Sequence, residues 1–460
     1  MWFWVQLICL IGTLLFFMKW KNYYIYSYPT RIPGPRRFPL FGNLIQLWWA
    51  HGGVRKGELF AALHKLGHKF GSVFTINLDS KYFVVVTDWD KELDQFTNNR
   101  DDQLRNIDPK LLQKIQKSDL DSILRPVLRR LVAQFRSDMA DGVKFVGHSH
   151  TLLNSSVMAA LCGVAGVEVG SEDVNNLVAK ADSVILKSKR QDGDGPESER
   201  LAKDEMRQLI QSLTPDSASP DPSLFFLLTQ IYHGAWSLLA WAVLYITLHP
   251  AIGDQMFTEV LTVTGNDLKE VVVSLKDRKM CGCDTLTHQN IQNPHIFNDF
   301  SPLGIYFKIL DDKFALLTLE VQRLASVRPL VTPPLKSQKA FTLREYEIPK
   351  ATRLLISLYS LHRNKSLWAY PDSFVPSQQL GDHVPSEGSA LRPPQFFLLG
   401  LPDPMQDIVN DVLFLFLATI ARNFKLVTVP GHLDPETRPV SSPGPILSPK
   451  PYNFVVMKRL

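Results

Sequence analysis

Cysteine is scarce in this chain, which has 460 residues and only four thiols, Cys9, Cys162, Cys281 and Cys283. So few and so scattered cysteines exclude a disulfide framework and are typical of a reducing compartment that faces the cytosol. The histidines near the Cys281-Gly-Cys283 pair do not stand at zinc-site spacings, so no metal is expected there. Cys162 lies among small apolar residues and is predicted to be a buried thiol. Residues 284–460 contain no cysteine, which excludes a sulfur ligand in that part of the chain.

A strong charge of one sign is also lacking. The formal net charge is +5, and no basic stripe with interleaved aromatic residues is visible, so nucleic acid is not an expected partner. The weak positive charge suits a protein that works beside an anionic membrane surface or an acidic partner. Apolar residues make up 45% of the chain, which is enough for a large buried core.

Charged side chains are absent from residues 2–18, which are almost wholly apolar. A helix of this length reaches about 26 Å, which is close to the thickness of a bilayer core. Lys19 and Lys21 follow directly and no basic residue precedes the segment, so the bulk of the chain is expected to face the cytosol. A basic n-region and a cleavage site of small residues are both missing, which disfavours a signal peptide. Residues 1–22 are therefore predicted to be a single-pass anchor, short enough for the thin membrane of the endoplasmic reticulum.

A proline-rich connector follows the anchor. Residues 23–43 include Pro33-Gly34-Pro35 and Gly42-Asn43, and proline fixes φ and cannot continue a helix. This stretch is predicted to be a stiff, turning hinge. Residues 44–460 are predicted to form one globular domain.

The remaining chain is predicted to be mainly α with small β-sheets. The apolar stretch 224–248 is interpreted as a buried core helix and not as a second membrane span, because it contains polar residues and lies between soluble-type segments. Residues 428–451 are rich in proline and serine and are predicted to be an irregular surface segment. Helices are expected over 58–70, 110–140, 154–186, 224–248, 251–262 and 305–326, and strands over 72–78, 82–87, within 340–358 and from 454.

Between residues 225 and 425 a set of motifs stands in a fixed order. It consists of Trp241-Ala-Val-Leu-Tyr245 with His249-Pro250, Glu320-Val-Gln-Arg323 with Arg328-Pro329, Tyr346 to Thr352, His362-Arg363-Asn364 with Trp368, and Leu413 to Phe424. With the anchor and the hinge, this order resembles the cytochrome P-450 superfamily of microsomal haem-thiolate monooxygenases. The resemblance implies the cytochrome P-450 fold after one transmembrane helix, haem as the family cofactor, and a flavoprotein reductase as a partner.

Glu320 and Arg323 lie three residues apart, so they share one face of a helix and can pair. The resemblance implies that they belong to the family's Glu-x-x-Arg helix, where an arginine from a later loop completes a structural network. Gln378 stands at that third position. An amide can hydrogen-bond to a carboxylate but cannot form a charged fork, so the predicted structural lock is weaker in its third member. The alternative is a surface ion pair.

The family's haem loop has the pattern Phe-x-x-Gly-x-Arg-x-Cys-x-Gly, in which the cysteine thiolate binds iron and favours O–O cleavage. When the pattern is anchored on Phe397 and Gly400, the arginine falls at Pro402, the cysteine at Pro404 and the last glycine at Gln406. None of these three positions keeps the family residue.

A second alignment, anchored on the downstream helix, places the cysteine at Asp403. Asp403 and Met405 are then the remaining candidate axial ligands, and neither donates electron density as a thiolate does. We therefore expect no metal site and no cofactor, and haem only with a ligand other than cysteine. A mis-spliced exon near residues 380–406 is another explanation of the missing cysteine, although the flanking pattern is continuous.

The family's distal helix carries an acid and an alcohol that relay protons to bound oxygen. Counting back from Trp241, the acid's position falls on His233 and the alcohol's on Gly234. His233 is the distal candidate for a catalytic role, because a histidine can relay protons near neutral pH. The alternative is a histidine hydrogen-bonded to backbone inside a buried helix.

Three functions stay open. The favoured one is a haem-deficient, non-catalytic protein of the endoplasmic reticulum membrane that binds an apolar molecule such as a sterol or lipid, because an empty cavity costs roughly 24 cal/mol per Å³. The second is a haem-dependent monooxygenase of sterols, lipids or xenobiotics with an unusual axial ligand. The third is an interaction protein for the reductase or another monooxygenase, with a basic face formed by Arg125, Arg129, Arg130 and Arg422.

Overall fold

The computed structural model describes most of the chain, in two compact units. The described residues are 6–7, 10–16, 32–35, 42–50, 59–78, 81–93, 119–139, 145–146, 149–187, 195–214, 222–265, 272–274, 313–331, 334–380, 403–441 and 446–459. Unit 1 consists of Met1–Asn99 and Leu330–Asn364, and unit 2 consists of Arg100–Pro329 and Lys365–Leu460.

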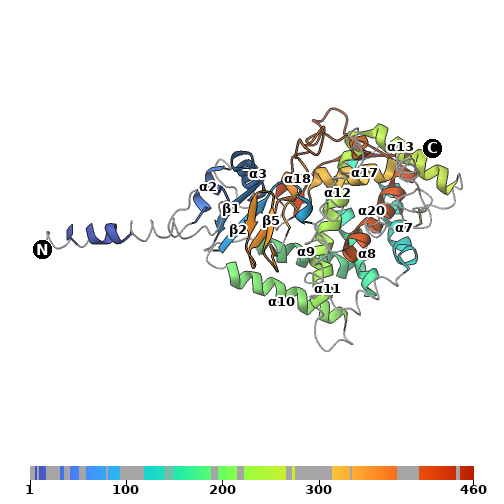
Figure 1. Cartoon of the computed structure of the whole chain (residues 1–460). Coiled ribbons are helices and arrows are strands. Elements are labelled where there is room, and N and C mark those ends of the chain that lie inside the picture. The colour runs from blue at the N-terminus through green and yellow to red at the C-terminus, as the bar shows by residue number, and fades with distance from the viewer. Residues whose placement is uncertain are drawn as a thin grey trace. The chain divides into compact units, whose positions relative to one another are not determined.

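Unit 1 is built on a four-stranded sheet with the order β1-β2-β7-β4 (Figure 1). β1 and β2 form the predicted antiparallel hairpin, and β2 pairs in parallel with β7. Apolar residues of α3 and β1 form a small core. The elements of this unit are α2 (Leu44–Ala50), α3 (Leu59–Phe70), β1 (Val73–Leu78), β2 (Lys81–Val86), η1 (Lys91–Leu93), β4 (Leu335–Lys336), β5 (Phe341–Leu343), β6 (Tyr346–Ile348), β7 (Arg353–Ile356) and α18 (Leu358–Leu361).

The proline-rich hinge packs directly on β1. A Cβ atom at Gly34 would lie 2.5 Å from the carbonyl oxygen of Thr75, so only glycine allows this approach. Gly42 has a φ of +56°, and a Cβ there would lie 2.6 Å from the carbonyl oxygen of Asn77. Asn43 is buried and accepts the backbone N–H of Asn77 at 2.7 Å. The hinge glycines are thus required by the contact with the strand.

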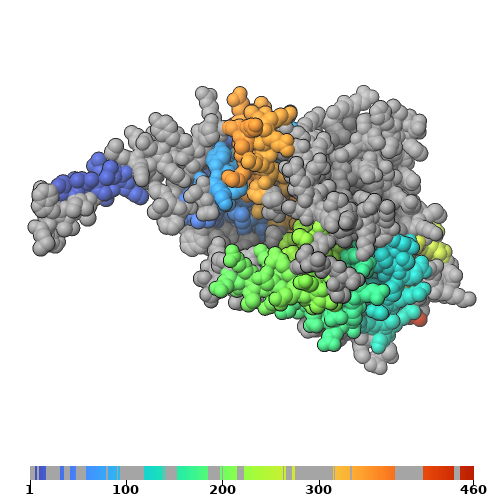
Figure 2. Space-filling model, turned by 90° about the horizontal axis from the view of Figure 1, so that it is seen from below, coloured from blue at the N-terminus to red at the C-terminus, as the bar shows by residue number. Residues whose placement is uncertain are grey.

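Unit 2 is mainly helical and holds most of the buried apolar residues. Figure 2 shows one face of this unit, along which helices α7 to α10 follow one another. Its helices are α7 (Leu120–Asp138), α8 (Ser149–Ala165), α9 (Ser171–Lys187), α10 (Gly195–Leu213), α11 (Pro222–Phe226), the π-helix η2 (Leu227–Ile231), α12 (Tyr232–Leu248), α13 (Pro250–Thr264), α17 (Lys313–Ala325), η5 (Pro376–Leu380) and α20 (Asp403–Asn423). Its strands are β3 (Phe145–Val146), β8 (Phe424–Val427), β9 (Val440–Ser441), β10 (Leu447–Ser448) and β11 (Phe454–Lys458).

α12 is the central helix of unit 2, with α8, α17 and α20 packed around it (Figure 1). The stretch Pro222–Leu248 is long and apolar enough to cross a membrane, but 94% of its apolar window is buried inside the protein. The surrounding helices therefore take the place that lipid would have. This burial agrees with the interpretation of the stretch as a core helix.

The composition predicted that residues 428–451 form an irregular surface segment. The structure differs, because part of this segment is buried. Ile446, Leu447 and Ser448 are buried. The carbonyl of Leu447 accepts hydrogen bonds from Ser237 Oγ at 2.7 Å and Trp241 Nε1 at 3.2 Å, both on α12. The prediction was wrong here because the partners are about two hundred residues away in the sequence, and composition carries no information about them.

Two predicted helices are divided in the structure. The stretch 154–186 forms α8 and α9, separated by a turn in which Gly166 has a φ of +70°. The apolar stretch 224–248 contains a π-helical turn, η2, before α12 begins. A π turn leaves the normal hydrogen-bond ladder and is found frequently at functional sites.

Candidate functional site

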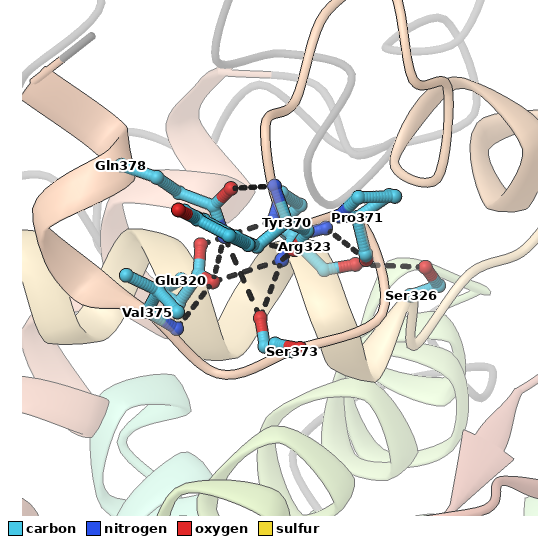
Figure 3. Close-up of polar contacts among 8 residues, drawn as sticks. All are labelled: Glu320, Arg323, Ser326, Tyr370, Pro371, Ser373, Val375 and Gln378. Atoms are coloured by element: carbon cyan, nitrogen blue, oxygen red, sulfur yellow. Dashed lines mark hydrogen bonds and ion pairs between the residues drawn. The ribbon is translucent and has the colours of Figure 1, made fainter. Parts of the chain in front are cut away.

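Glu320 and Arg323 form a fully buried ion pair on α17 (Figure 3). Arg323 Nε donates to Glu320 Oε2 at 2.9 Å, and Arg323 Nη2 donates to Oε1 at 2.8 Å. This bidentate geometry is the strong form of an arginine–carboxylate contact. Since both side chains are inaccessible to solvent, the pair is not a surface ion pair.

Gln378 reaches the same carboxylate from η5 (Figure 3). Its Nε2 donates to Glu320 Oε1 at 2.6 Å, and its Oε1 accepts the backbone N–H of Tyr370 at 3.1 Å. The structure thus brings together the three residues singled out in the sequence. The amide satisfies both a carboxylate and a backbone N–H, and an arginine could not accept the N–H because it has no acceptor atom.

The loop that precedes η5 wraps around Arg323. Its guanidinium donates to the backbone carbonyls of Pro371 at 2.6 Å and Ser373 at 3.1 Å, and lies 4.9 Å from the ring centre of Trp368. Val375 N–H donates to Glu320 Oε1 at 3.0 Å. Because these hydrogen bonds hold the loop to α17, the arrangement suits a structural role rather than chemistry.

His233 lies in the first turn of α12, immediately after the π-helix, and is buried. The indole N–H of Trp236 donates to His233 Nδ1 at 3.1 Å. An indole nitrogen can only donate, so the neutral ring carries its proton on Nε2. His233 Nε2 lies 3.6 Å from Asp182 Oδ1 on α9, which is beyond hydrogen-bond distance. The ring is thus bonded to the side chain of Trp236, and a hydrogen bond with the backbone of Ala181 also acts on it, in agreement with the expected alternative.

The pKa of His233 is lowered to about 4, mainly by burial and also by the positive charge of Arg328, while a hydrogen bond with the backbone of Ala181 opposes this change. Burial raises the pKa of Asp182 to about 6. A second proton on His233 would have to bind Nδ1 and would break the bond from Trp236. The geometry therefore does not suit a proton relay near neutral pH. Asp182 and Trp236 were not anticipated, although the spacing of Trp236 from His233 is one helical turn.

Replacement of Asp182 by Asn should leave His233 as the one titrating member of this pair, so that its own contribution to the pH dependence of stability is exposed. His233 stays neutral in the folded protein to about pH 4 but gains a proton near pH 6.5 in the unfolded chain. Stability should thus be full above pH 6.5 and fall by at most about 3 kcal/mol as the pH decreases to about 4. In the unchanged protein the raised pKa of Asp182 opposes this slope. Urea unfolding at several pH values measures the effect.

The matched control is the double variant Asp182→Asn, His233→Gln, which removes both titrating groups. Its stability should lack the additional loss between pH 6.5 and about 4. An identical pH profile in the single and double variants would show that His233 is not held neutral by the fold.

The positions predicted to correspond to the haem loop are only partly described. Phe397, Gly400 and Pro402 lie outside the described residues. Asp403 is the first residue of α20, followed by Pro404, a residue that the first turn of a helix accommodates without loss of a hydrogen bond. Met405 and Gln406 follow in the same helix. Within the described residues, no group of three or more His, Cys, Asp or Glu side chains is arranged to hold a metal ion.

The model of the cytochrome P450 family matches residues 318–389, the stretch that contains the Glu320–Arg323–Gln378 network. Bovine cytochrome P450 2U1 is 26% identical over 226 residues, which are 48% of this chain and 34% of the bovine protein. A probable cytochrome P450 305a1 of Drosophila melanogaster is 33% identical over 144 residues, 31% of this chain and 27% of that protein. The chain is thus matched over about a third of the length of these curated relatives or less.

A zebrafish cytochrome P450, solved with abiraterone, superimposes with a TM-score of 0.61 at 14% identity, covering 87% of this chain and 99% of that one. This chain belongs to the cytochrome P450 superfamily. The mainly helical architecture with small sheets is the P450 fold, as the motif order predicted.

The residues of this P450 chain do not fit a haem-thiolate centre. At the start of α20, the two positions predicted to align with the ligand cysteine lack sulfur, and Pro404 has no donor atom in its side chain. The described cysteine, Cys162, is buried in α8, and burial raises the pKa of its thiol to about 12. Cys162 is thus the buried thiol that the sequence predicted, and it is no substitute ligand.

The arginines proposed for a basic face divide into two groups. Arg125, Arg129 and Arg130 lie on α7, where the last two are exposed. Arg422, near the end of α20, contacts the side chain of Thr264 and the carbonyl of Gly265. Only α7 therefore offers exposed positive charge from this set.

Proposed function

We propose that this P450 chain is a haem-deficient, non-catalytic protein that binds an apolar small molecule. The observation that carries the proposal is the start of α20, where Asp403 and Pro404 occupy the two positions at which the ligand cysteine is expected. A carboxylate is a hard ligand and lacks the electron donation by which a thiolate favours O–O cleavage. Without that donation the scaffold is left with binding.

Space beside α12 supports an apolar ligand. Gly234 is buried, yet a Cβ atom built on it would meet no atom of the described residues within 4 Å, the adjacent residues and nearby backbone of its own helix aside. Protein interiors are close-packed, and an empty cavity costs roughly 24 cal/mol per Å³. The neighbouring residues of α12 are mostly apolar, so the molecule that fills this space should be apolar too, such as a sterol or a fatty acyl chain.

Membrane attachment is part of the proposal. Residues 10–16 are helical, and the side chains of Leu10, Ile11, Leu14, Leu15 and Phe16 are exposed. A row of exposed apolar side chains in a helix favours contact with lipid. We propose a single-pass anchor over residues 1–22 in the endoplasmic reticulum membrane, with the bulk of the chain facing the cytosol. This orientation gives access to apolar molecules dissolved in the bilayer.

An absorbance spectrum of the full-length protein, purified from haem-replete cells, tests the proposal. We expect no Soret band and far less than one haem per chain, because no thiolate is available to the iron. The variants Asp403→Cys and Pro404→Cys, purified in parallel, are matched controls that restore sulfur at the two aligned positions. A band in the unchanged protein that moves to about 450 nm with carbon monoxide would replace the proposal by a monooxygenase.

Two other candidate functions each have one supporting observation. A haem-dependent monooxygenase with an unusual ligand is favoured by the relatives, which include the steroid 17-alpha-hydroxylase/17,20 lyase of Squalus acanthias, 30% identical over 121 residues, 25% of this chain and 23% of that protein. An interaction with a flavoprotein reductase or another monooxygenase is favoured by the exposed Arg129 and Arg130 on α7.

A further inference from the structure

Arg328 is a buried cation beside the π-helix. It follows α17 and is only 7% exposed. Its Nη2 donates to the backbone carbonyl of Gln230 at 3.0 Å, and its Nε has no hydrogen-bond partner among the described residues. The guanidinium of Arg328 has five N–H donors, and among the described residues one backbone carbonyl accepts from it.

No carboxylate of the described residues lies within 4.0 Å of Arg328. Removal of a charge from water costs several kcal/mol unless a counter-ion and hydrogen bonds compensate for it. Asp182 does not supply this charge, since it lies beside His233 and 40% of its side chain is exposed. Burial also lowers the pKa of Arg328 to about 10, and no negative charge opposes that change.

The adjacent turn of α12 presents further donors that lack strong acceptors. The hydroxyl of Tyr232 is buried and lacks a hydrogen-bond partner among the described residues. His233 Nε2, which carries the proton of the neutral ring, is also buried and has only the backbone of Ala181 as a weak acceptor. The rings of Tyr232 and His233 are 4.9 Å apart between centroids. An ionised carboxylate accepts hydrogen bonds and donates none, so it would complement the donors of Arg328, Tyr232 and His233.

We propose that Arg328 binds the carboxylate of an amphipathic ligand whose apolar part occupies the space beside Gly234. The inference rests on the proposed function and narrows its ligand from apolar molecules in general to those with one carboxylate, of which long-chain fatty acids are the simplest class. A haem propionate carries the same group on an apolar ring, so the test must separate the two sources.

The test compares palmitic acid with hexadecanol, its alcohol of equal chain length, on the full-length protein in lipid nanodiscs, with empty nanodiscs as the blank. The unchanged protein should bind the acid at least about tenfold more tightly than the alcohol. Arg328→Gln should lose this preference and keep the binding of the alcohol, because it removes the charge and leaves the apolar space. Arg328→Lys should retain part of the preference, because it keeps the charge without the fork.

Each outcome separates this inference from the proposed function. Equal binding of acid and alcohol to the unchanged protein would overturn the role of Arg328 and leave apolar binding intact. Binding of neither would overturn both. Addition of haemin tests the other source of a carboxylate, the haem propionate. A stoichiometric Soret band that Arg328→Gln abolishes would support a carboxylate site at Arg328 and would overturn the haem-deficient function.

Discussion

Glu320→Ala is expected to lower the free energy of unfolding by about 3 kcal/mol or more. The substitution leaves Arg323 buried without its carboxylate, and it also removes the acceptor of Gln378 Nε2 and Val375 N–H. Arg323 keeps the carbonyls of Pro371 and Ser373, which holds the effect near the lower end of the range for broken buried pairs. Urea unfolding followed by tryptophan fluorescence measures the change.

The double variant Glu320→Leu, Arg323→Met is the control for the charge. It replaces both partners by apolar side chains, and such replacements of buried pairs are frequently neutral or stabilising. We therefore expect it to be more stable than Glu320→Ala. Gln378→Ala should lose only about 1.5 kcal/mol, since it removes one hydrogen bond to a charged group. A loss below about 1 kcal/mol in Glu320→Ala would argue against a structural lock.

Trp241→Ala is expected to destabilise the protein by about 4 kcal/mol. Trp241 is inaccessible to solvent at the centre of unit 2, and its ring stacks on Tyr245 with 5.8 Å between centroids. Tyr245 in turn stacks on Phe374 at 4.4 Å. Removal of the indole opens a cavity in a helix that is packed on all sides, so the surrounding side chains can close it only in part.

Trp241→Phe separates packing from hydrogen bonding in the same unfolding experiment. It keeps a ring against Tyr245 and removes the N–H that donates to the carbonyl of Leu447. Ser237 Oγ still donates to that carbonyl at 2.7 Å, so no buried acceptor is left alone. We expect a loss of about 1 kcal/mol. Equal losses in the two variants would show that the hydrogen bond, and not the volume, determines the stability.

The features that were predicted correctly depend on neighbours in the sequence. The hairpin of β1 and β2 follows from two β-rich runs and a short turn, and α3 and α13 follow from helical periodicity with breaking residues at their ends. The contact of Glu320 with Arg323 follows from a spacing of three residues on one helix. Such features are set by local geometry.

The predicted haem-loop positions depend on residue type and not on packing. The absence of sulfur at Asp403 and Pro404 is a property of the sequence alone, and no packing can alter it. The structure adds that a helix begins at these residues. Phe397, Gly400 and Pro402 stay predictions, because they lie outside the described residues.

The order of motifs predicted the superfamily, and the residue types of the stretch 224–248 predicted a central buried helix, because both are written in residue type and spacing. The missing sulfur ligand follows from the same sequence and stays a prediction. Only the tertiary structure decided three contacts. Trp236 bonds to His233, Leu447 is buried against α12, and Arg328 donates to the π-helix with no counter-ion among the described residues. Apart from the one-turn contact between Trp236 and His233, these contacts join segments about one hundred residues or more apart. The energies of these contacts depend on which polar groups are buried together away from water, and this is decided only by the packing of the folded chain.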